Sequence, residues 1–438
     1  MRKRCCPGLI LVALAFAALG GCATYSEKVK TVEGHLRAQD PEKALQALDK
    51  IHYPDKDQVL YQMDKATLLR MAGDYRASNT ALEQAKVLIE ELTAPSVTEQ
   101  AARFTVNDAS TSYIGTPLEQ LMVHVYAALN YLELGDIGAA RVEALQMDQV
   151  IRRLNEYRKG SRPLDVAFAR YLSGIVFEHL LEWSDAMIAC RKAYNAYTEF
   201  GPVLGVELPA SLKHALLRLA EQQGLDAELA QYRKSFGITQ WQSLASRSAQ
   251  AEIIFFLHNG LAPIKRQRSI IAPVPSSGQL IRISVPEYEG RGGKARIARL
   301  QAGDELIDTV RVENIDAVAR LTLEEQMPAI MARTAARNAI KYTVAHQAGR
   351  QDDLAGLLVN LFNVATEIAD TRSWLTLPGE IQMARLLLPP GRYDLRVDVL
   401  GSGGVMASRT WPGIELGAGD KRYLSYHWIP SGMVTTRH

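Results

Sequence analysis

The sequence predicts a multidomain α+β protein in which an N-terminal helical solenoid is followed by an antiparallel β-sandwich with an inserted helical hairpin. Three observations support this prediction. Turns built on glycine, aspartate and proline recur between apolar helical stretches up to about residue 248. Apolar and polar residues begin to alternate near Ala251, as expected of strands with one buried face. Two helical stretches then separate two groups of predicted strands.

The first 25 residues precede the predicted fold. A basic start over residues 2–4 leads into an apolar stretch over residues 9–18, and small residues follow. This order is typical of a secretory signal peptide, here residues 1–21. The run Leu19-Gly20-Gly21-Cys22 resembles the bacterial lipobox. The resemblance implies that Cys22 is acylated and becomes the first residue of the mature chain, with residues 22–25 as a lipidated linker.

Ala23 bears on the expected location. In lipoproteins of this kind an aspartate after the acylated cysteine favours retention in the inner membrane, so Ala23 implies an outer-membrane anchor with the domains facing the periplasm. One acyl chain binds a membrane marginally, whereas several chains on one cysteine hold it stably. Outer-membrane lipid, contacted through Cys22, is therefore one expected partner. Display at the cell surface is the orientation that the sequence leaves open.

Composition narrows the classes of function. The chain has 438 residues, 47% of them apolar and 22% charged, with a formal net charge of +2. Nucleic acid is not an expected partner, because such a binding surface needs a strong excess of basic residues. Cys190 is the one cysteine left after the predicted signal peptide and Cys22, so it has no partner for an intramolecular disulfide. It lies within a predicted helix, and we expect it to be a buried small residue.

Residues 26–248 form the predicted solenoid. Its turns include Asp40-Pro41, Gly73-Asp74 and Gly135-Asp136, and Ala44 and Ala77 are 33 residues apart. The stretch from Leu60 to Ala85 resembles the tetratricopeptide repeat, whose period is about 34 residues. Stacked helical hairpins form a concave surface that suits a partner peptide or helix. Six tyrosines are candidates to line that surface, although core packing is the favoured role for each: Tyr75, Tyr126, Tyr131, Tyr171, Tyr194 and Tyr197.

Residues 249–438 form the predicted β-sandwich. Strands are expected at residues 252–257, 279–286, 294–298, 309–312, 388–397 and 423–428. The stretch Pro390-Gly391-Arg392-Tyr393-Asp394-Leu395 resembles a strand of small immunoglobulin-like sandwiches of the PEGA and carboxypeptidase-regulatory type. The glycine-rich runs at residues 290–294 and 401–404 are expected to be hairpin turns. The helical hairpin is predicted at residues 324–370, and we expect its small-residue faces to pack on its own domain.

No pattern of catalytic, metal-binding or cofactor-binding residues stands out, so the sequence predicts a protein that is not an enzyme and needs no cofactor. His258 and His427 fall at strand ends and could meet in space. The most site-like stretch contains Asp370, Arg372 and Trp374, which could contact a partner or serve a structural role. We expect the structural role, with an Asp370–Arg372 pair that locks the helical insert onto the sandwich.

Three stretches, residues 259–265, 286–288 and 369–378, resemble a group of bacterial outer-membrane lipoproteins without assigned function. Together with the repeats, this resemblance implies a lipid-anchored periplasmic scaffold that binds an envelope protein partner and assists assembly or regulation of a cell-envelope machine. The alternative is a glycan- or peptidoglycan-binding lipoprotein. The aromatic residues that would offer sugar-binding faces are Trp374, Trp411, Tyr423, Tyr426 and Trp428.

Overall fold

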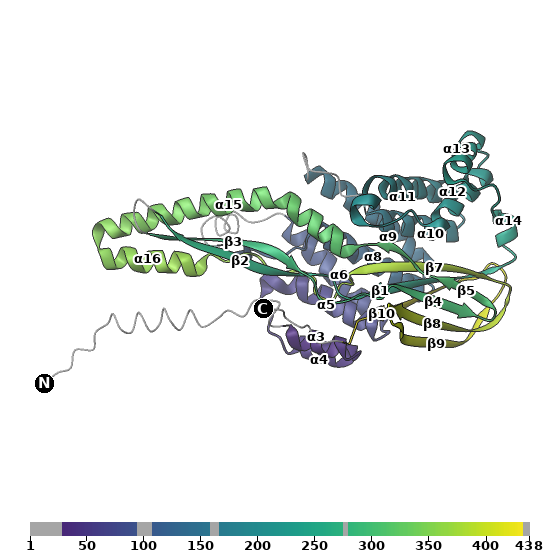
Figure 1. Ribbon diagram of the computed structural model, residues 1–438, viewed down its shortest axis with the longest axis horizontal. Helices are drawn as coiled ribbons and strands as arrows, with labels where there is room; N and C mark the ends of the chain where they lie inside the picture. The colour runs from purple at the N-terminus through teal and green to yellow at the C-terminus, as the bar shows by residue number, and fades with distance from the viewer. Residues whose placement is uncertain (1–28, 94–106, 158–165, 275–278, 432–438) are drawn as a thin grey trace.

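The computed structural model describes residues 29–93, 107–157, 166–274 and 279–431. The predicted signal peptide, Cys22 and the linker at residues 22–25 lie outside these ranges. The described chain folds into a body of helices and two sheets, from which a long arm projects (Figure 1).

The N-terminal half consists of antiparallel helix pairs that contact one another in sequence order. This confirms the predicted helical solenoid. The pairs are α3 (Lys30–Arg37) with α4 (Pro41–Asp49), α5 (Gln58–Met71) with α6 (Tyr75–Leu92), α8 (Pro117–Glu133) with α9 (Ile137–Tyr157), α10 (Ala167–His179) with α11 (Trp183–Leu204), and α12 (Ala210–Gln222) with α13 (Asp226–Phe236); the short α14 (Leu244–Arg247) follows.

Each turn within a pair repeats one local design. An aspartate caps the second helix in three pairs, where Asp40, Asp74 and Asp136 each accept a hydrogen bond from the backbone N–H three residues on. Before each cap, one residue takes the left-handed conformation that ends the first helix. These residues are Gln39, Gly73, Gly135, Leu181 and, in the last pair, Gly224.

In the first, second, third and fourth pairs, a small, fully buried residue lies four positions after the residue that caps the second helix, and it lets the two helices approach closely. The residues are Ala44, Ser78, Ala140 and Ala186. Ala44 and Ser78 are 34 residues apart, so the repeat matches the tetratricopeptide period through Ser78 and not through the half-buried Ala77 that the sequence pattern indicated.

The left-handed glycines lead to a test of this turn design. We expect Gly73→Ala to lower the free energy of unfolding by about 1–2 kcal/mol, because a Cβ disfavours the φ of +86°. Gly34→Ala is the matched control, because Gly34 lies inside α3 and an added Cβ meets nothing within 4 Å at either site. That control should raise stability by about 0.5–1 kcal/mol. Urea unfolding measures both; equal effects of the two changes would contradict this reading of the turn.

Two four-stranded sheets form the sandwich. The first, sheet A, has the order β10-β1-β7-β6 and the second, sheet C, has the order β5-β4-β8-β9. The strands of sheet A are β1 (Ala251–Asn259), β6 (Val310–Glu313), β7 (Glu380–Leu388) and β10 (Lys421–Trp428). Those of sheet C are β4 (Ile297–Ala302), β5 (Glu305–Asp308), β8 (Gly391–Gly401) and β9 (Gly404–Leu416). The turn between β8 and β9 confirms the predicted hairpin at residues 401–404.

The prediction of a wholly antiparallel sandwich is wrong at one place, because β1 and β10 run parallel. These strands are the first and last of the sandwich, so no hairpin turn joins them and their direction is set by packing. The apolar run of β1 fits this central position, since every residue of the strand is buried. Ile254 and Phe256 face the repeat helices, while Ile253 and Phe255 face sheet C. The solenoid and sheet A therefore share one hydrophobic core.

The arm consists of two insertions that lie side by side (Figure 1). The ribbon of β2 (Ile264–Pro273) and β3 (Leu280–Glu289) follows β1, and the helices α15 (Ile315–Gln351) and α16 (Asp353–Thr366) follow β6. The predicted helical hairpin is thus present, but α15 begins at Ile315 and not at residue 324. The Asn314 side chain caps it by accepting a hydrogen bond from the Ala317 N–H.

The hairpin packs on its own domain, since α15 and α16 contact β3, but it leaves its outer faces exposed. One further expectation for this region is wrong. The glycine-rich run at residues 290–294 is not a hairpin turn, because it links β3 of the ribbon to β4 of sheet C. Arg291, within that run, is buried and donates to the carbonyl oxygens of Ala262 and Leu375. The run therefore fastens the base of the arm to the body.

Candidate interaction sites

The segment at residues 369–378, here called the docking segment, connects α16 to β7 and runs against the repeat helices. Trp374 is its most buried residue, with 1% of its surface exposed. Its backbone N–H donates to Glu119 Oε1 at 2.6 Å, and its indole N–H lies 3.0 Å from the Thr67 hydroxyl. Two residues on, the Thr376 N–H donates to Asp64 Oδ1 at 3.0 Å. Helices α5 and α8 therefore hold the segment through both its backbone and its side chains.

Glu119 can hold this segment because of its place on α8. It is the third residue of the helix and forms a capping box, in which the Thr116 N–H donates to Glu119 Oε2 at 2.6 Å. The Tyr113 hydroxyl donates to the same oxygen at 2.5 Å. The positive end of the helix dipole favours a carboxylate here. Glu119 Oε1 is thus left to accept from Trp374, so a local capping signal also provides the tertiary contact.

Arg372 and Asp370 form the ion pair that the sequence predicted, with 2.7 Å between Arg372 Nη2 and Asp370 Oδ2. Burial raises the pKa of Asp370, but the charge of Arg372 outweighs this and lowers it overall. Arg372 also donates to Asp57 Oδ1 at 2.8 Å and to the Thr111 carbonyl, and it stacks 5.1 Å above the Tyr113 ring. The prediction that this pair fastens the helical insert to the sandwich is therefore wrong. The pair instead joins the base of the arm to the repeat half, just before α5.

The inner face of the repeats is filled by the chain itself. Tyr126 packs against Trp374 with ring centroids 5.6 Å apart, and the Tyr197 hydroxyl donates to the Val312 carbonyl of β6. Tyr171, also buried, lies against Arg385 of β7. Three of the six candidate tyrosines thus line the inner face, but their contacts are with sheet A and the docking segment. A partner of this folded chain must bind another surface.

A buried ion network also joins the repeats to sheet A. Arg385 of β7 pairs with Glu252 of β1 at 2.6 Å and with Glu178 of α10 at 3.4 Å, and Arg218 of α12 reaches Glu178 at 3.2 Å. Burial raises the pKa of Glu252, but Arg385 outweighs it and brings it to about 2. All four groups are therefore charged at neutral pH and neutralise one another in the core.

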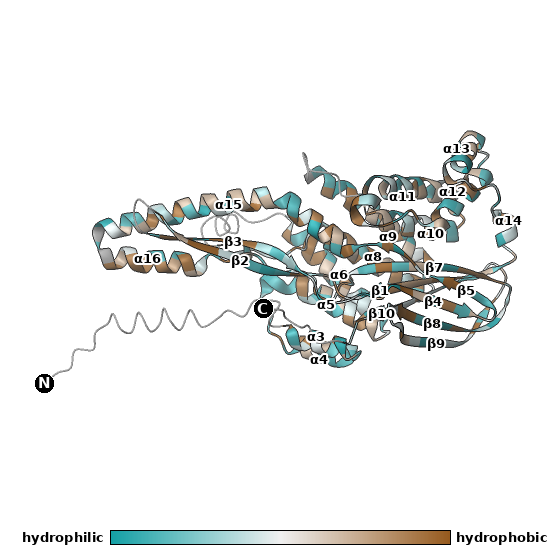
Figure 2. Cartoon of the chain, viewed as in Figure 1, coloured by the Kyte–Doolittle hydropathy of each residue, from teal (hydrophilic) through white to brown (hydrophobic). Residues whose placement is uncertain are grey.

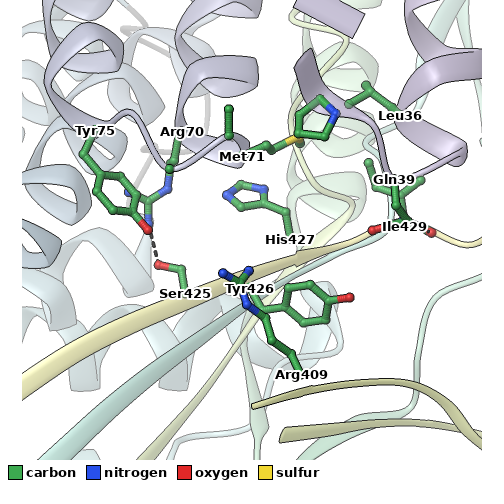
Figure 3. A pocket seen from close by; sticks show the side chains of 13 residues that line it. Leu36, Gln39, Arg70, Met71, Tyr75, Arg409, Ser425, Tyr426, His427 and Ile429 are labelled. Carbon is green, nitrogen blue, oxygen red and sulfur yellow. Dashed lines mark hydrogen bonds between the residues drawn. The ribbon is translucent and has the colours of Figure 1, made fainter. Parts of the chain in front are cut away.

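A pocket lies at the seam between α3–α6 and sheets A and C, with a volume of about 190 Å³ (Figure 3). Arg70, Tyr75, Arg409, Tyr426 and His427 lie around it. Arg70 already donates to Ser425 and lies 3.6 Å from Glu133, so its charge is neutralised within the protein. Arg409 is exposed and lies 5.5 Å above the Tyr426 ring. This pocket can accommodate a small planar or anionic group beside Arg409.

His427 reaches this pocket and meets His258, as the sequence indicated. Their rings stack 4.0 Å apart, because parallel register places the two residues side by side on β1 and β10. Burial lowers the pKa of both residues well below the usual value, so the pair is neutral at physiological pH. Among the described residues, no three histidine, cysteine, aspartate or glutamate side chains are grouped as a metal site requires.

An outer groove remains open on the repeats between α6, α8 and α9, with a volume of about 500 Å³. Its apolar lining comes from Val87, Ile89, Val123 and Val150. Beside it, the buried carboxylate of Glu143 bridges Lys86 at 2.6 Å and His124 at 2.8 Å. Nothing in the sequence pattern singled out this groove, because its lining is divided among three separate helices.

Cys190 is fully buried on α11, and burial raises the pKa of its thiol to about 12. A Cβ at Gly174 of α10 would lie only 2.7 Å from the Cys190 sulfur, so the thiol packs in the space that Gly174 leaves. This confirms the prediction of a buried small residue.

The aromatic side chains proposed for sugar binding are mostly unavailable. Trp374, Tyr423 and Trp428 are at most 4% exposed and belong to the two cores. Trp411 and Tyr426 are half-buried, with Arg409 over both rings. The glycan-binding alternative therefore loses three of its five residues.

Within the ranges that the structure covers, no helix combines the length and apolar character needed to cross a bilayer. Neither a protein-family model nor a curated protein sequence matches the chain. Solved structures of MamA are similar to about half of it. The MamA structure from Desulfovibrio magneticus RS-1 covers 48% of this chain and 93% of its own, with 15% identity and a TM-score of 0.31. A MamA structure from AMB-1 covers 48% of this chain and 91% of its own, with 14% identity and a TM-score of 0.29. The resemblance to outer-membrane lipoproteins stays a prediction.

Proposed function

We propose that this protein is a lipid-anchored scaffold, tethered through Cys22 to the outer membrane and facing the periplasm, that binds envelope proteins and assists assembly or regulation of a cell-envelope machine. The observation that carries this proposal is the outer groove on a repeat whose inner face is already occupied. In such a protein the inner face of the repeats is held by the chain itself, and partners bind the outer surface.

The groove suits an amphipathic partner helix. Val87, Ile89, Val123 and Val150 provide an apolar floor, and its margin carries Lys86 and Arg153 together with Glu83 and Glu90. A helix laid in such a groove is bound through apolar residues spaced three and four apart, with polar residues directed to the mixed-charge margin. Val87 is 54% exposed, so it is available for this contact.

Photo-crosslinking in intact cells tests the proposal. A photoreactive side chain at Val87 is expected to give a discrete adduct with an envelope protein. The same side chain at Val203, which is 58% exposed on α11 and outside the groove, is the matched control and should give no such adduct. Cys22→Ser should abolish both palmitate labelling and the Val87 adduct, because the unacylated chain is no longer held at the membrane.

Three results would count against the proposal. The first is no adduct at Val87, or the same adducts at Val203. The second is unchanged membrane association in Cys22→Ser, which would remove the anchor. The third is retention of the purified chain on cell wall without other proteins, which would favour peptidoglycan as the ligand.

A further inference from the structure

The outer part of the arm is rich in apolar residues, most densely along α16 (Figure 2), and many of their side chains are exposed. Seven side chains of valine to phenylalanine size on its helices are each about half exposed, and they leave on the order of 600 Å² of apolar surface in water. The largest apolar patch on a typical monomer is about 300–600 Å². The seven side chains are Met331, Ile340, Val344, Leu354, Leu357, Leu361 and Phe362.

Three charged residues in the middle part of the arm point inward. Arg337 and Glu367 are fully buried and pair at 2.7 Å, and Lys341 reaches the other oxygen of Glu367 at 2.9 Å. The outward face of α15 from residue 328 to 344 carries alanine, methionine, isoleucine, valine, threonine and proline. This is the reverse of the pattern on a solvated helix, in which charged residues face water. The arrangement therefore indicates a surface that is covered in the working state.

The two helices present faces of different shape. The outward face of α15 is rich in small side chains, with Ala332, Ala335, Ala336 and Ala339 all exposed. The outward face of α16 is a bulky ridge, because Leu354, Leu357, Leu361 and Phe362 recur at helical spacing. A ridge of large side chains on one helix packs into the groove that small side chains leave on another. The arm thus carries both halves of a helix-to-helix contact.

A bilayer is a poor occupant for this surface. The far end of the arm, where α15 meets α16, exposes His346, Gln347, Arg350 and Asp352. Insertion of the arm tip first would place these polar groups in hydrocarbon, at a cost of about 2.5–3.5 kcal/mol for each charged side chain near the centre. Alanine methyl groups also contribute little to lipid partition, whereas they favour close helix contact.

We propose that a second copy of this chain covers the arm, with the leucine ridge of α16 from each copy lying on the alanine face of α15 in the other. Both helices of both copies then meet in one interface, so about 600 Å² from each copy gives roughly 1,200 Å² in total, which exceeds the about 1,000 Å² expected of a specific interface. Because each copy uses the same two faces, the contact builds a two-fold dimer. This self-association goes beyond the binding of envelope partners and does not depend on the lipid anchor.

Cysteine cross-linking of the full chain in cells tests this arrangement. Copies carrying Ala336→Cys and differently tagged copies carrying Leu357→Cys are co-expressed and treated with a mild oxidant. We expect a disulfide between the two tags and a purified mass, under non-denaturing conditions, of at least twice the monomer. Cys190 does not interfere, because it is fully buried. Copies carrying Val142→Cys are the control, because Val142 is 49% exposed on α9 and should not cross-link to either position.

A third variant separates loss of contact from loss of folding. Leu357→Glu places a charge on a side chain that is 54% exposed, so the chain should stay folded by circular dichroism and become monomeric. A monomer in the unmodified chain, or cross-links between Ala336→Cys copies alone, would overturn the proposed contact. So would labelling of Leu357→Cys by a lipid-borne photoprobe in phosphatidylethanolamine–phosphatidylglycerol vesicles, since the arm would then lie in the bilayer.

Discussion

Trp374→Ala is expected to lower the free energy of unfolding by about 3–5 kcal/mol, the range for removing a large aromatic side chain from a core. The side chain is 1% exposed and lies between α5, α8 and sheet A. Its removal leaves a cavity at the junction of the repeats and the sandwich. It also removes the indole donor to the Thr67 and Thr376 hydroxyls, each 3.0 Å away. Urea unfolding followed by circular dichroism measures the loss.

Two controls separate the contributions to this loss. Trp374→Phe keeps most of the ring and removes the indole N–H, so it should cost about 1 kcal/mol for the hydrogen bond and a further amount for lost ring volume. Trp241→Ala removes a half-buried tryptophan whose indole N–H donates to Glu221 at 3.0 Å on the surface, and its effect should be smaller. Similar losses in Trp374→Ala and Trp241→Ala would mean that the docking segment does not fasten the two halves.

The sequence predicted the parts of the fold that depend on local chemistry. Asp74 and Asp136 cap their helices through backbone groups three residues away, so the turn pattern alone identified the helix pairs. The strand β8 was recognised because a proline–glycine turn leads into alternating residues. The strand β9 was missed, since it contains Pro412 and Gly413 and carries few apolar residues on a regular alternation.

The remainder depends on contacts between residues far apart in the chain. Trp374 was singled out, but its partners Glu119 and Thr67 lie 255 and 307 positions earlier, so its role as the fastening of the repeat interior could not be derived. The orientation of the arm helices could not be derived for a related reason. The small-residue faces of these helices were recognised, but which face turns inward is decided by the buried Arg337–Glu367 pair.

The buried ion network between the repeats and sheet A provides a sharp energetic test. Arg385→Met keeps much of the side-chain volume but removes the main positive charge beside Glu178 and Glu252. The two carboxylates then remain in the core with only the weaker compensation of Arg218, Arg247 and Lys421. Removing one partner of a buried pair costs about 3–5 kcal/mol. We expect that loss at neutral pH, measured by urea unfolding. Arg141→Met is the control, because the Arg141–Glu182 pair is 39% and 29% exposed and should contribute at most about 1 kcal/mol.

The pH dependence distinguishes a charge effect from a packing effect. In the unmodified protein the pKa of Glu252 is about 2, below its unfolded value, so its contribution is complete above the unfolded pKa and is lost as pH falls from about 4.5 towards about 2. Without Arg385 the pKa of Glu252 in the folded protein rises, so this carboxyl takes up a proton at a higher pH in the variant than in the unmodified protein. Protonation removes the uncompensated buried charge and with it part of the variant's loss of stability. The difference in stability should therefore narrow between about pH 7 and about pH 4. Because a cavity left by a shorter side chain would cost the same at both pH values, an unchanged difference would assign the loss to packing.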